Sequence, residues 1–396
     1  MTTRFAFLPA GFIAVVLLVT SGYAAAQTSL DKVLTPYLSR YELPALAAAV
    51  VKNGKITAVG AVGTRRAGEK NPVTLNDRLH LGSDTKAMTS LMIAIFVEKG
   101  KLGWKTTLPE IFPELAEKMD SRLKTVTVEQ LLSHTSGISP DKEEVFEAYG
   151  KSYEVDGNLD EMRYSIVRDW STHPLESDPG SLFAYANMNY VIAGAILERL
   201  SGRTWEELMF EHIFVPLGLK SAGIGPQASM GKIDAPVGHS LKDGQPKAFL
   251  TGPNGDGPAV LGPAGMAHMS VLDFARWAGW NAGEGKRGPA LVKPETLKKL
   301  HTPVVQTPEM KDVPPGTPRN GRYALGWGEV TVDWAPHPLV QHSGSNMKNL
   351  THIWLDPGND FAMVVLTNIG GKRADEALLA LAPELYKKFA ATKAGK

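Results

Sequence analysis

Serine and lysine three residues apart form the pattern in this sequence best suited to nucleophilic chemistry. Ser-x-x-Lys occurs six times, and context favours Ser83-Asp84-Thr85-Lys86, which follows Leu81-Gly82 and opens a strongly apolar helix predicted over 83–99. In the first turn of a helix, residues three apart share one face, so hydroxyl and amine would lie together. Backbone N–H groups at that helix end would favour a developing oxyanion. The alternative interpretation is an N-cap serine beside an exposed lysine.

Tyr-x-Asn occurs once, as Tyr185-Ala186-Asn187, just before a helix predicted over 189–200. A nearby ammonium favours the phenolate, so we expect Lys86 to lower the pKa of Tyr185. Such a pair could deprotonate Ser83 and later protonate the leaving group. The Asn187 amide offers both a donor and an acceptor to a substrate amide. The alternative is a packed aromatic ring followed by a helix-capping asparagine.

A third pattern, His342-Ser343-Gly344, follows the apolar stretch 338–340. Gly344 would let substrate lie against the edge of the chain. We expect His342 to orient Tyr185 and to meet a substrate carboxylate. The N–H of Ser345 would join that of Ser83 as the second donor to an oxyanion. The alternative is a solvent-facing histidine in a turn.

Other catalytic classes have little support in the sequence. The chain lacks G-x-S-x-G, H-E-x-x-H and a Walker A loop, which argues against an α/β-hydrolase nucleophile elbow, a zinc hydrolase and a P-loop enzyme. The absence of cysteine removes disulfides, thiolate metal sites and a cysteine nucleophile. We therefore predict no metal and no cofactor. A formal net charge of +1 without a basic run argues against nucleic acid and favours a small-molecule or peptide substrate.

The N-terminal stretch 1–26 is typical of a signal peptide. Arg4 precedes an apolar run over 5–19, and Ala24-Ala25-Ala26 provides a cleavage site of small residues. We expect cleavage after Ala26 and a periplasmic or secreted protein with no stable membrane span. The alternative, a single membrane anchor, is less favoured because the run is short and contains Pro9 and Gly11.

Strand-like segments at both ends of the chain enclose a helical middle. Asn53-Gly54 between two apolar runs is a strong hairpin signal. The predicted strands are 45–51, 56–62, 323–330, 351–355 and 361–368, and the predicted terminal helices are 30–41 and 373–392. This order favours an α/β (α+β) fold, in which one antiparallel sheet is flanked by N- and C-terminal helices and carries an all-helical insertion. The predicted domains are 27–82 with 300–396, and 83–299, with the active site in the cleft between them.

In this order, the motifs at Ser83, Tyr185 and His342 resemble those of the penicillin-recognising serine hydrolases. The similarity is to the class C β-lactamase branch, with its DD-peptidase, D-aminopeptidase and esterase relatives. Further similar segments are 131–138, Gly265-Met266 with Asp273, and 323–327. The resemblance implies a β-lactamase/transpeptidase-like fold, Ser83 as nucleophile, Lys86 and Tyr185 as the acid–base pair, Asn187 on the substrate amide and Ser345 in the oxyanion hole. His134 and Ser136 are interpreted as structural, in a tight turn that ends a helix.

Two departures bear on the substrate. His342 stands where class C β-lactamases carry lysine, which is more similar to DD-peptidases and D-aminopeptidases, and the Ser-Asp-Asn motif of class A enzymes is missing. We therefore expect an exported hydrolase that forms a Ser83 acyl-enzyme with D-Ala-type peptides or small amides and esters, with β-lactams as further candidates. The alternatives are a true class C-like β-lactamase, a non-catalytic sensor of wall fragments or penicillin, and an α/β-hydrolase that uses another serine.

Overall fold

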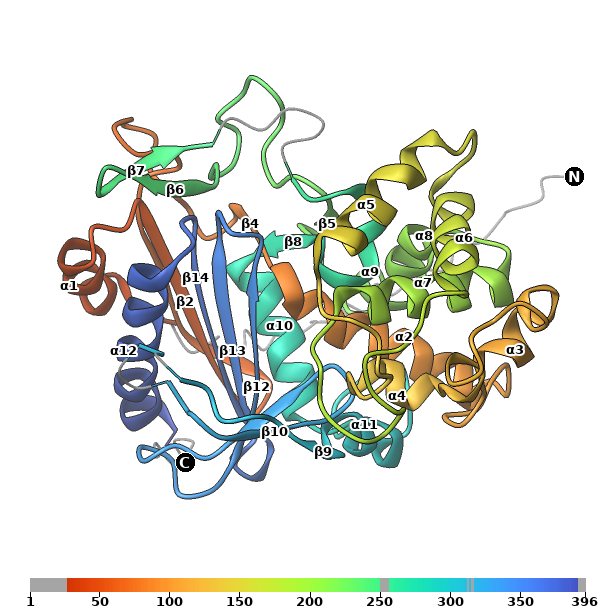
Figure 1. The fold of residues 1–396 in the computed structure, drawn as a ribbon. Coiled ribbons are helices and arrows are strands. Elements are labelled where there is room, and N and C mark those ends of the chain that lie inside the picture. Colours follow the sequence, from red (N-terminus) through yellow and green to blue (C-terminus); the bar gives the residue numbers. More distant parts are fainter. Residues whose placement is uncertain (1–26, 250–255, 312, 315–316, 391–396) are drawn as a thin grey trace, which may run out of the picture.

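The two ends of the chain meet in one sheet (Figure 1). The computed structural model describes residues 27–249, 256–311, 313–314 and 317–390, so the predicted signal peptide lies outside the described residues. Strand β2 (Ala45–Lys52) pairs antiparallel with β3 (Lys55–Gly63) on one side and with β14 (Phe361–Thr367) on the other. The nine-stranded sheet has the order β1-β3-β2-β14-β13-β12-β11-β10-β9, in which only the β1–β3 pair is parallel. The predicted antiparallel sheet is thus confirmed.

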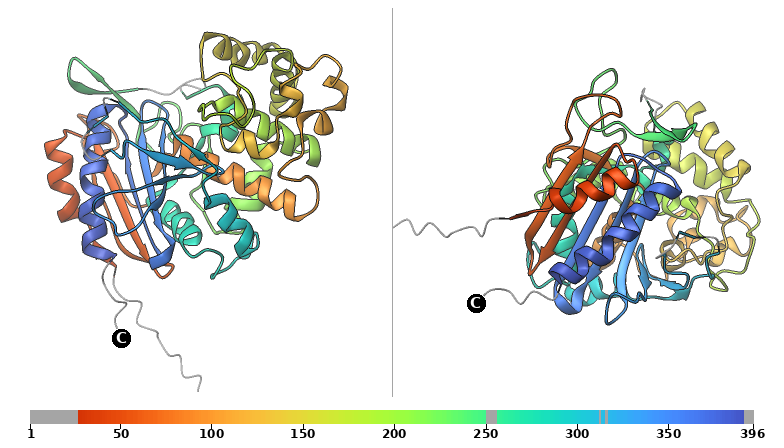
Figure 2. Two further views of the ribbon diagram at one scale, coloured as in Figure 1. Left: turned by 60° about the horizontal axis from the view of Figure 1, so that its bottom comes forward. Right: turned by 90° about the vertical axis from the view of Figure 1, so that its left-hand side faces the viewer.

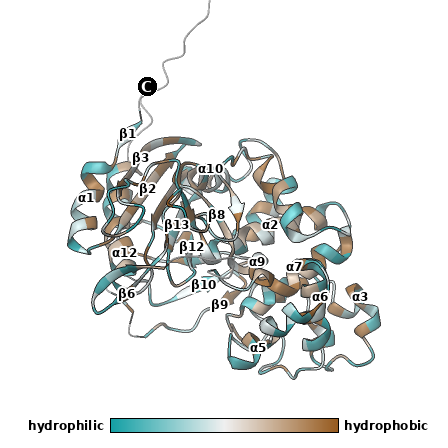
Figure 3. Cartoon of the chain, turned by 90° about the horizontal axis from the view of Figure 1, so that it is seen from above, coloured by the Kyte–Doolittle hydropathy of each residue, from teal (hydrophilic) through white to brown (hydrophobic). Residues whose placement is uncertain are grey.

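Helices cover both faces of this sheet (Figure 2). Along β2, Leu46, Ala48 and Val50 face the core formed with α1 (Asp31–Arg40) and α12 (Lys372–Phe389). The alternate residues of β2 face a second, larger core that includes α10 (Val271–Ala282). Because both faces are buried, β2 and β14 are nearly continuous apolar runs rather than alternating ones. Figure 3 shows these brown strands between helices banded in brown and teal.

The segment between the sheet strands is mainly helical. Its two long central helices, α2 (Thr85–Glu98) and α7 (Asn187–Ser201), pack against each other and are buried over most of their length. The remaining helices there are α3 (Leu108–Ile111), α4 (Val128–Leu132), α5 (Glu143–Lys151), α6 (Leu159–Trp170), α8 (Trp205–Met209), α9 (Gly262–Gly265) and α11 (Pro294–His301).

Short strands accompany these helices, so the insertion is not helical throughout. They are β4 (Arg78–His80), β5 (Gly223–Ile224), β6 (His239–Lys242), β7 (Gln245–Ala248) and β8 (Ala267–Ser270). The other sheet strands are β1 (Thr28–Ser29), β9 (Val305–Gln306), β10 (Gly321–Tyr323), β11 (Gly328–Val330), β12 (Leu339–Ser345) and β13 (Leu350–Asp356). Helix α10 falls within the range predicted for the helical domain but packs on the sheet. The predicted domain limits therefore stay a prediction.

One predicted strand is wrong in detail. The predicted range 323–330 begins at the last residue of β10, passes through a turn and ends with β11, and these two short strands pair with each other. Gly326 between them has φ +81°, a left-handed conformation that breaks an extended chain. The hairpin at Asn53-Gly54 is confirmed, with φ values of 51° and 71°. Among the described helices, none combines the length and apolarity needed to cross a bilayer.

Candidate active site

Ser83 and Lys86 lie together where the chain enters α2. Ser83 is in a short 3-10 turn, Gly82–Asp84, that leads directly into the helix. Lys86 Nζ is 3.1 Å from Ser83 Oγ, and the lysine side chain is fully buried. The one-turn spacing therefore brings hydroxyl and amine into contact, and the alternative of an exposed lysine is wrong.

Glycines allow β12 to approach this turn closely. A Cβ on Gly344 would lie 1.8 Å from the carbonyl oxygen of Leu81, and a Cβ on Gly82 would lie 2.3 Å from Ser345 N. No larger residue fits at either position. Gly344 thus lets the strand meet the nucleophile turn, which places the Ser345 backbone beside Ser83, whereas the sequence predicted that it makes room for substrate.

Tyr185 completes the group around Ser83. Its ring centroid is 4.8 Å from Lys86 Nζ, and its hydroxyl interacts with the Ser83 side chain. Burial raises the pKa of the Tyr185 phenol well above its ordinary value, Asp141 and Asp84 add to that rise, and the interaction with Ser83 only partly opposes it. The prediction of a lowered Tyr185 pKa is wrong, because desolvation of the phenolate outweighs the nearby amine.

Lys86, rather than Tyr185, is poised to change protonation near neutral pH. Burial lowers the pKa of Lys86 to about 7, although Asp141 and Asp84 both act to raise it. Nζ lies 2.6 Å from Asn187 Oδ1 and 2.7 Å from the carbonyl oxygen of Ala264. A neutral amine has two N–H donors, which match these two acceptors, and one lone pair, which is left for the Ser83 hydroxyl. The contacts around Lys86 thus fit a general base.

Asp141 is a site residue that the sequence analysis missed. Its carboxylate accepts hydrogen bonds from Asn187 Nδ2 and, at 3.3 Å, from Asn187 N. These bonds fix the amide of Asn187 with Oδ1 toward Lys86, so only one side-chain N–H remains for a substrate. Asp141 lies in the loop before α5, where no spacing pattern in the sequence marks it.

His342 has other partners than those predicted. Its Nε2 is 3.0 Å from the Tyr323 hydroxyl, and its Nδ1 is 2.9 Å from the Ser343 carbonyl oxygen and 3.3 Å from Asp84 Oδ1. The side chain is buried. His342 therefore contacts Tyr323 where contact with Tyr185 was expected, and it is not an exposed turn residue. Its contact with a substrate carboxylate stays a prediction.

His134, interpreted from sequence as structural, brackets Tyr185. Its carbonyl oxygen accepts from Ala184 N at 2.8 Å, and its Nδ1 accepts from Ala186 N at 3.2 Å. The imidazole is fully buried, with its centroid 4.2 Å from that of the Tyr185 ring. Ser136 Oγ donates to Asn189 Oδ1 at 2.7 Å, which turns the Asn189 amide nitrogen toward the same Nδ1. The turn thus holds Tyr185 from both sides.

We expect His134→Phe to lower kcat about 10- to 100-fold while KM changes little. Phenylalanine leaves Ala186 N without its buried acceptor and is strained at the φ of +57° that His134 adopts, so Tyr185 loses its position. His134→Asn keeps an acceptor and tolerates this backbone, so it should recover part of kcat. Steady-state kinetics of both variants, beside their thermal unfolding, checks this. Equal kcat in both variants would point to a purely structural role.

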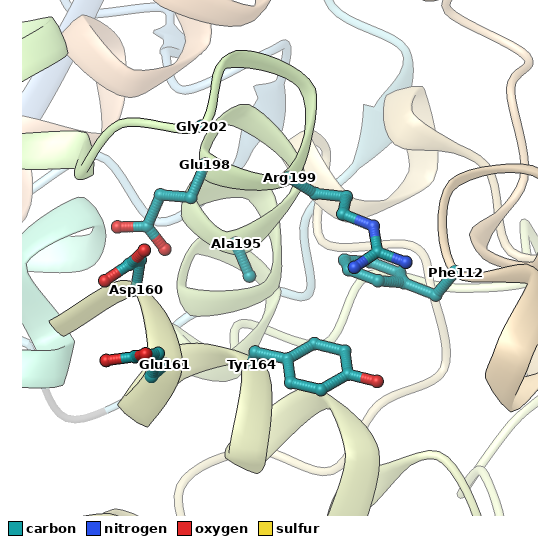
Figure 4. Close-up of a pocket in the computed structure, with 8 residues that line it drawn as sticks. All are labelled: Phe112, Asp160, Glu161, Tyr164, Ala195, Glu198, Arg199 and Gly202. Carbon is teal, nitrogen blue, oxygen red and sulfur yellow. The ribbon is translucent and has the colours of Figure 1, made fainter. Parts of the chain in front are cut away.

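A cavity of about 290 Å³ opens above Ser83. Its lining includes Asp141, Asn187 and Ser345 from three separate parts of the chain. A separate hollow of about 320 Å³, remote from Ser83 in its lining residues, lies between α6 and α7 (Figure 4). Two of its charged groups are engaged in ion pairs, Glu198 with Arg163 and Arg199 with Glu114, and none of the sequence-predicted site residues lines it. The Ser83 cavity is therefore the candidate active site.

The family model described as Beta-lactamase matches residues 30–385, nearly all of the described chain. The protein belongs to the beta-lactamase family. It is thus a serine hydrolase, as the resemblance of the three motifs implied. The family match also favours a small-molecule or peptide substrate.

Curated relatives of this beta-lactamase family member are distant in sequence. "Protein flp" of Staphylococcus aureus strain MW2 is 24% identical over 349 residues, which are 88% of this chain and 64% of the relative. The chain thus spans less than two thirds of that protein. "Penicillin-binding protein 4" of Amycolatopsis lactamdurans is 25% identical over 338 residues, which are 84% of this chain and 82% of the relative.

Solved structures confirm the predicted fold class. The octameric penicillin-binding protein homologue from Pyrococcus abyssi superposes with a TM-score of 0.69 at 25% identity, covering 89% of this chain and 76% of that one. A D-stereospecific amidohydrolase from Streptomyces sp. gives a TM-score of 0.66 at 18% identity, covering 89% and 95%. At such identity, the second likeness shows the fold alone.

Proposed function

We propose that the protein is an exported hydrolase that cleaves amide or ester bonds through an acyl-enzyme on Ser83. The observation that carries this proposal is the setting of Lys86, whose two nearest acceptors leave a lone pair for the Ser83 hydroxyl. Export is proposed from the predicted signal peptide, residues 1–26. The division into the domains 27–82 with 300–396, and 83–299, is also part of the proposal.

The acylation step follows from these contacts. Lys86 accepts the Ser83 proton as Ser83 Oγ bonds to the substrate carbonyl carbon, whose π electrons move onto the oxygen. The backbone N–H groups of Ser83 and Ser345 stabilise that oxyanion, and one such donor contributes about 3 kcal/mol to lowering the barrier. When the carbonyl re-forms, the bond to the leaving group breaks.

The leaving group takes a proton from the Lys86–Tyr185 pair. Tyr185 remains a phenol at neutral pH because burial raises its pKa, so it can donate its proton and regain one from the Lys86 ammonium. Water then attacks the acyl-enzyme by the reverse sequence of proton transfers, which frees the acid and restores Ser83. Asp141 and His134 act through Asn187 and Tyr185 as positioning residues.

For the substrate we propose D-Ala-type peptides or small amides and esters. The names of two relatives, a penicillin-binding protein and a D-stereospecific amidohydrolase, support this range. β-Lactams are further candidates, and a true class C-like β-lactamase is the alternative within the same chemistry. A non-catalytic wall-fragment sensor is the alternative from another class, but Ser83, Lys86 and Tyr185 are all present and in contact.

A substrate panel tests the proposal. It comprises nitrocefin, a p-nitrophenyl ester, a D-Ala-D-Ala peptide and a D-amino-acid anilide, each incubated with the wild-type protein. We expect turnover of the ester or of an amide, and weaker turnover of nitrocefin. Labelling by a fluorescent penicillin without any turnover would favour the sensor, and neither turnover nor labelling would contradict the acyl-enzyme.

A further inference from the structure

The Ser83 cavity adjoins a larger one. The neighbouring cavity has a volume of about 570 Å³, against about 290 Å³ at Ser83. Asp256, Gly257 and Met266 line both, so the two cavities lie side by side, and together they are called the cleft below. Together they fall in the range of pockets that enclose a whole small-molecule ligand, well beyond what a single reacting carbonyl needs.

Apolar side chains dominate the lining of this cleft. The first cavity is lined by Phe146, Leu261, Met266 and Met347, and the second by Leu159, Phe210, Ile224 and Pro226. Several of these side chains are exposed although large: Phe146 is 55% exposed, Phe210 44% and Met347 83%. Exposed apolar groups that gather around a cleft indicate a surface for an apolar ligand.

The charges of the cleft are negative. The acidic and basic side chains that line the two cavities are Asp141, Glu206, Asp256 and His268, beside the phenol of Tyr153. Burial lowers the pKa of His268 to about 4, so this ring is neutral at pH 7. Asp256 stays ionised, because His80, 2.8 Å away, and further hydrogen bonds lower its pKa against the effect of burial. In the part of the chain that the structure describes, no lysine or arginine lines either cavity.

The nearest candidates for a positive charge are used elsewhere. Lys86 lies beneath Ser83 and is the proposed base, and His342 is buried against Tyr323 and Asp84. Lys348 Nζ lies 3.8 Å from the centroid of the Phe249 ring, and Lys348 is not among the lining residues of either cavity. Arg163 and His80, which pair with Glu206 and Asp256, are buried and line neither cavity. An anionic acyl group would therefore meet carboxylates on the lining and no lysine or arginine there with which to pair.

The second cavity lies away from the proton-transfer pair. The leaving-group atom must sit within reach of the Lys86–Tyr185 pair that protonates it, and Lys86 contacts Ser83 and Asn187, which line the first cavity and not the second. We propose that this cavity binds the apolar chain of the acyl group, so that the protein selects uncharged or amine-bearing acyl donors with long apolar chains and disfavours carboxylates. This inference rests on the proposed acyl-enzyme at Ser83.

A series of p-nitrophenyl esters, from acetate through butyrate to octanoate, tests the chain-length part. Burial of one methylene is equivalent to about a fourfold gain, so kcat/KM should rise at least about 100-fold from acetate to octanoate. Phe210→Ala should lower the octanoate-to-acetate ratio about tenfold. Val215→Ala, at an exposed position nearby that lines neither cavity, should leave this ratio unchanged.

The charge part is tested with p-nitrophenyl hemisuccinate beside the butyrate ester. We expect kcat/KM for the hemisuccinate to be at least about tenfold lower, because its carboxylate approaches Asp141 and Asp256. A flat chain-length series, or equal turnover of hemisuccinate and butyrate, would overturn the inference and leave the acyl-enzyme intact. Absence of turnover of all these esters together with absence of labelling at Ser83 would instead contradict the proposed function.

Discussion

Ser83→Ala is expected to lower kcat/KM about 10⁴-fold or more for every substrate that the wild-type protein turns over. The reason is that alanine removes the hydroxyl that lies 3.1 Å from Lys86 Nζ and interacts with Tyr185. Covalent labelling by a fluorescent penicillin should disappear with the activity. Rates on the best substrate of the panel and a labelled gel measure both effects.

Ser229→Ala is the matched control, because Ser229 begins another Ser-x-x-Lys sequence. The Ser229 side chain is exposed, its hydroxyl donates a hydrogen bond to Asp234, and it lines neither cavity of the cleft. This variant should keep wild-type rates and labelling. If Ser83→Ala instead retained ester hydrolysis, the nucleophile would be another serine, as the α/β-hydrolase alternative requires.

Lys86→Met is expected to lower kcat about 10³-fold and to abolish a pH dependence that the wild-type protein should show. In the wild-type protein, burial lowers the pKa of Lys86 to about 7. Below pH 7 the ammonium has no lone pair for Ser83, and above pH 7 the neutral amine can accept the proton. We therefore expect kcat/KM to rise with pH and to level off above an apparent pKa near 7.

The pH–rate profile between pH 5 and 9 measures this, with an ester whose own hydrolysis is subtracted. Lys86→Arg should be as inactive as Lys86→Met, since a guanidinium stays protonated over the whole range. Lys232→Met, at the exposed lysine of the Ser229-x-x-Lys232 sequence, serves as control and should keep the wild-type profile. A rise near pH 7 that survives in Lys86→Met would assign the titrating base to another group.

The local features of the fold could be predicted from the sequence because they depend on residues that are near neighbours in the chain. The Asn53-Gly54 hairpin and the strands on either side follow from turn chemistry and apolar runs that tertiary contacts did not override. The strand predicted over 323–330 failed because the glycine at 326 adopts a left-handed conformation, which sequence alone does not require. A glycine within an apolar run fits either a strand or a turn, so only the packed structure decides.

The site residues likewise divide into those that local sequence motifs predict and those that only the folded chain brings together. Helical spacing predicts that Ser83 and Lys86 share a face, and the resemblance of three ordered motifs placed Tyr185 and Asn187 beside them. Asp141 and the bracket around Tyr185 from His134 depend on loops that meet only on folding. No periodicity encodes such contacts, so the sequence marks neither Asp141 nor the role of His134 in positioning Tyr185.

The sequence by itself thus determined which side chains could react and in what class of hydrolase. Only the tertiary structure decided their protonation, because a pKa depends on how completely water is excluded. Desolvation raises the pKa of Tyr185, whereas charge alone predicted a lower pKa. Desolvation also lowers the pKa of Lys86 to about 7, so that this amine can be neutral near neutral pH. That exclusion of water is a property of packing between distant segments, so it has no local signature in the chain.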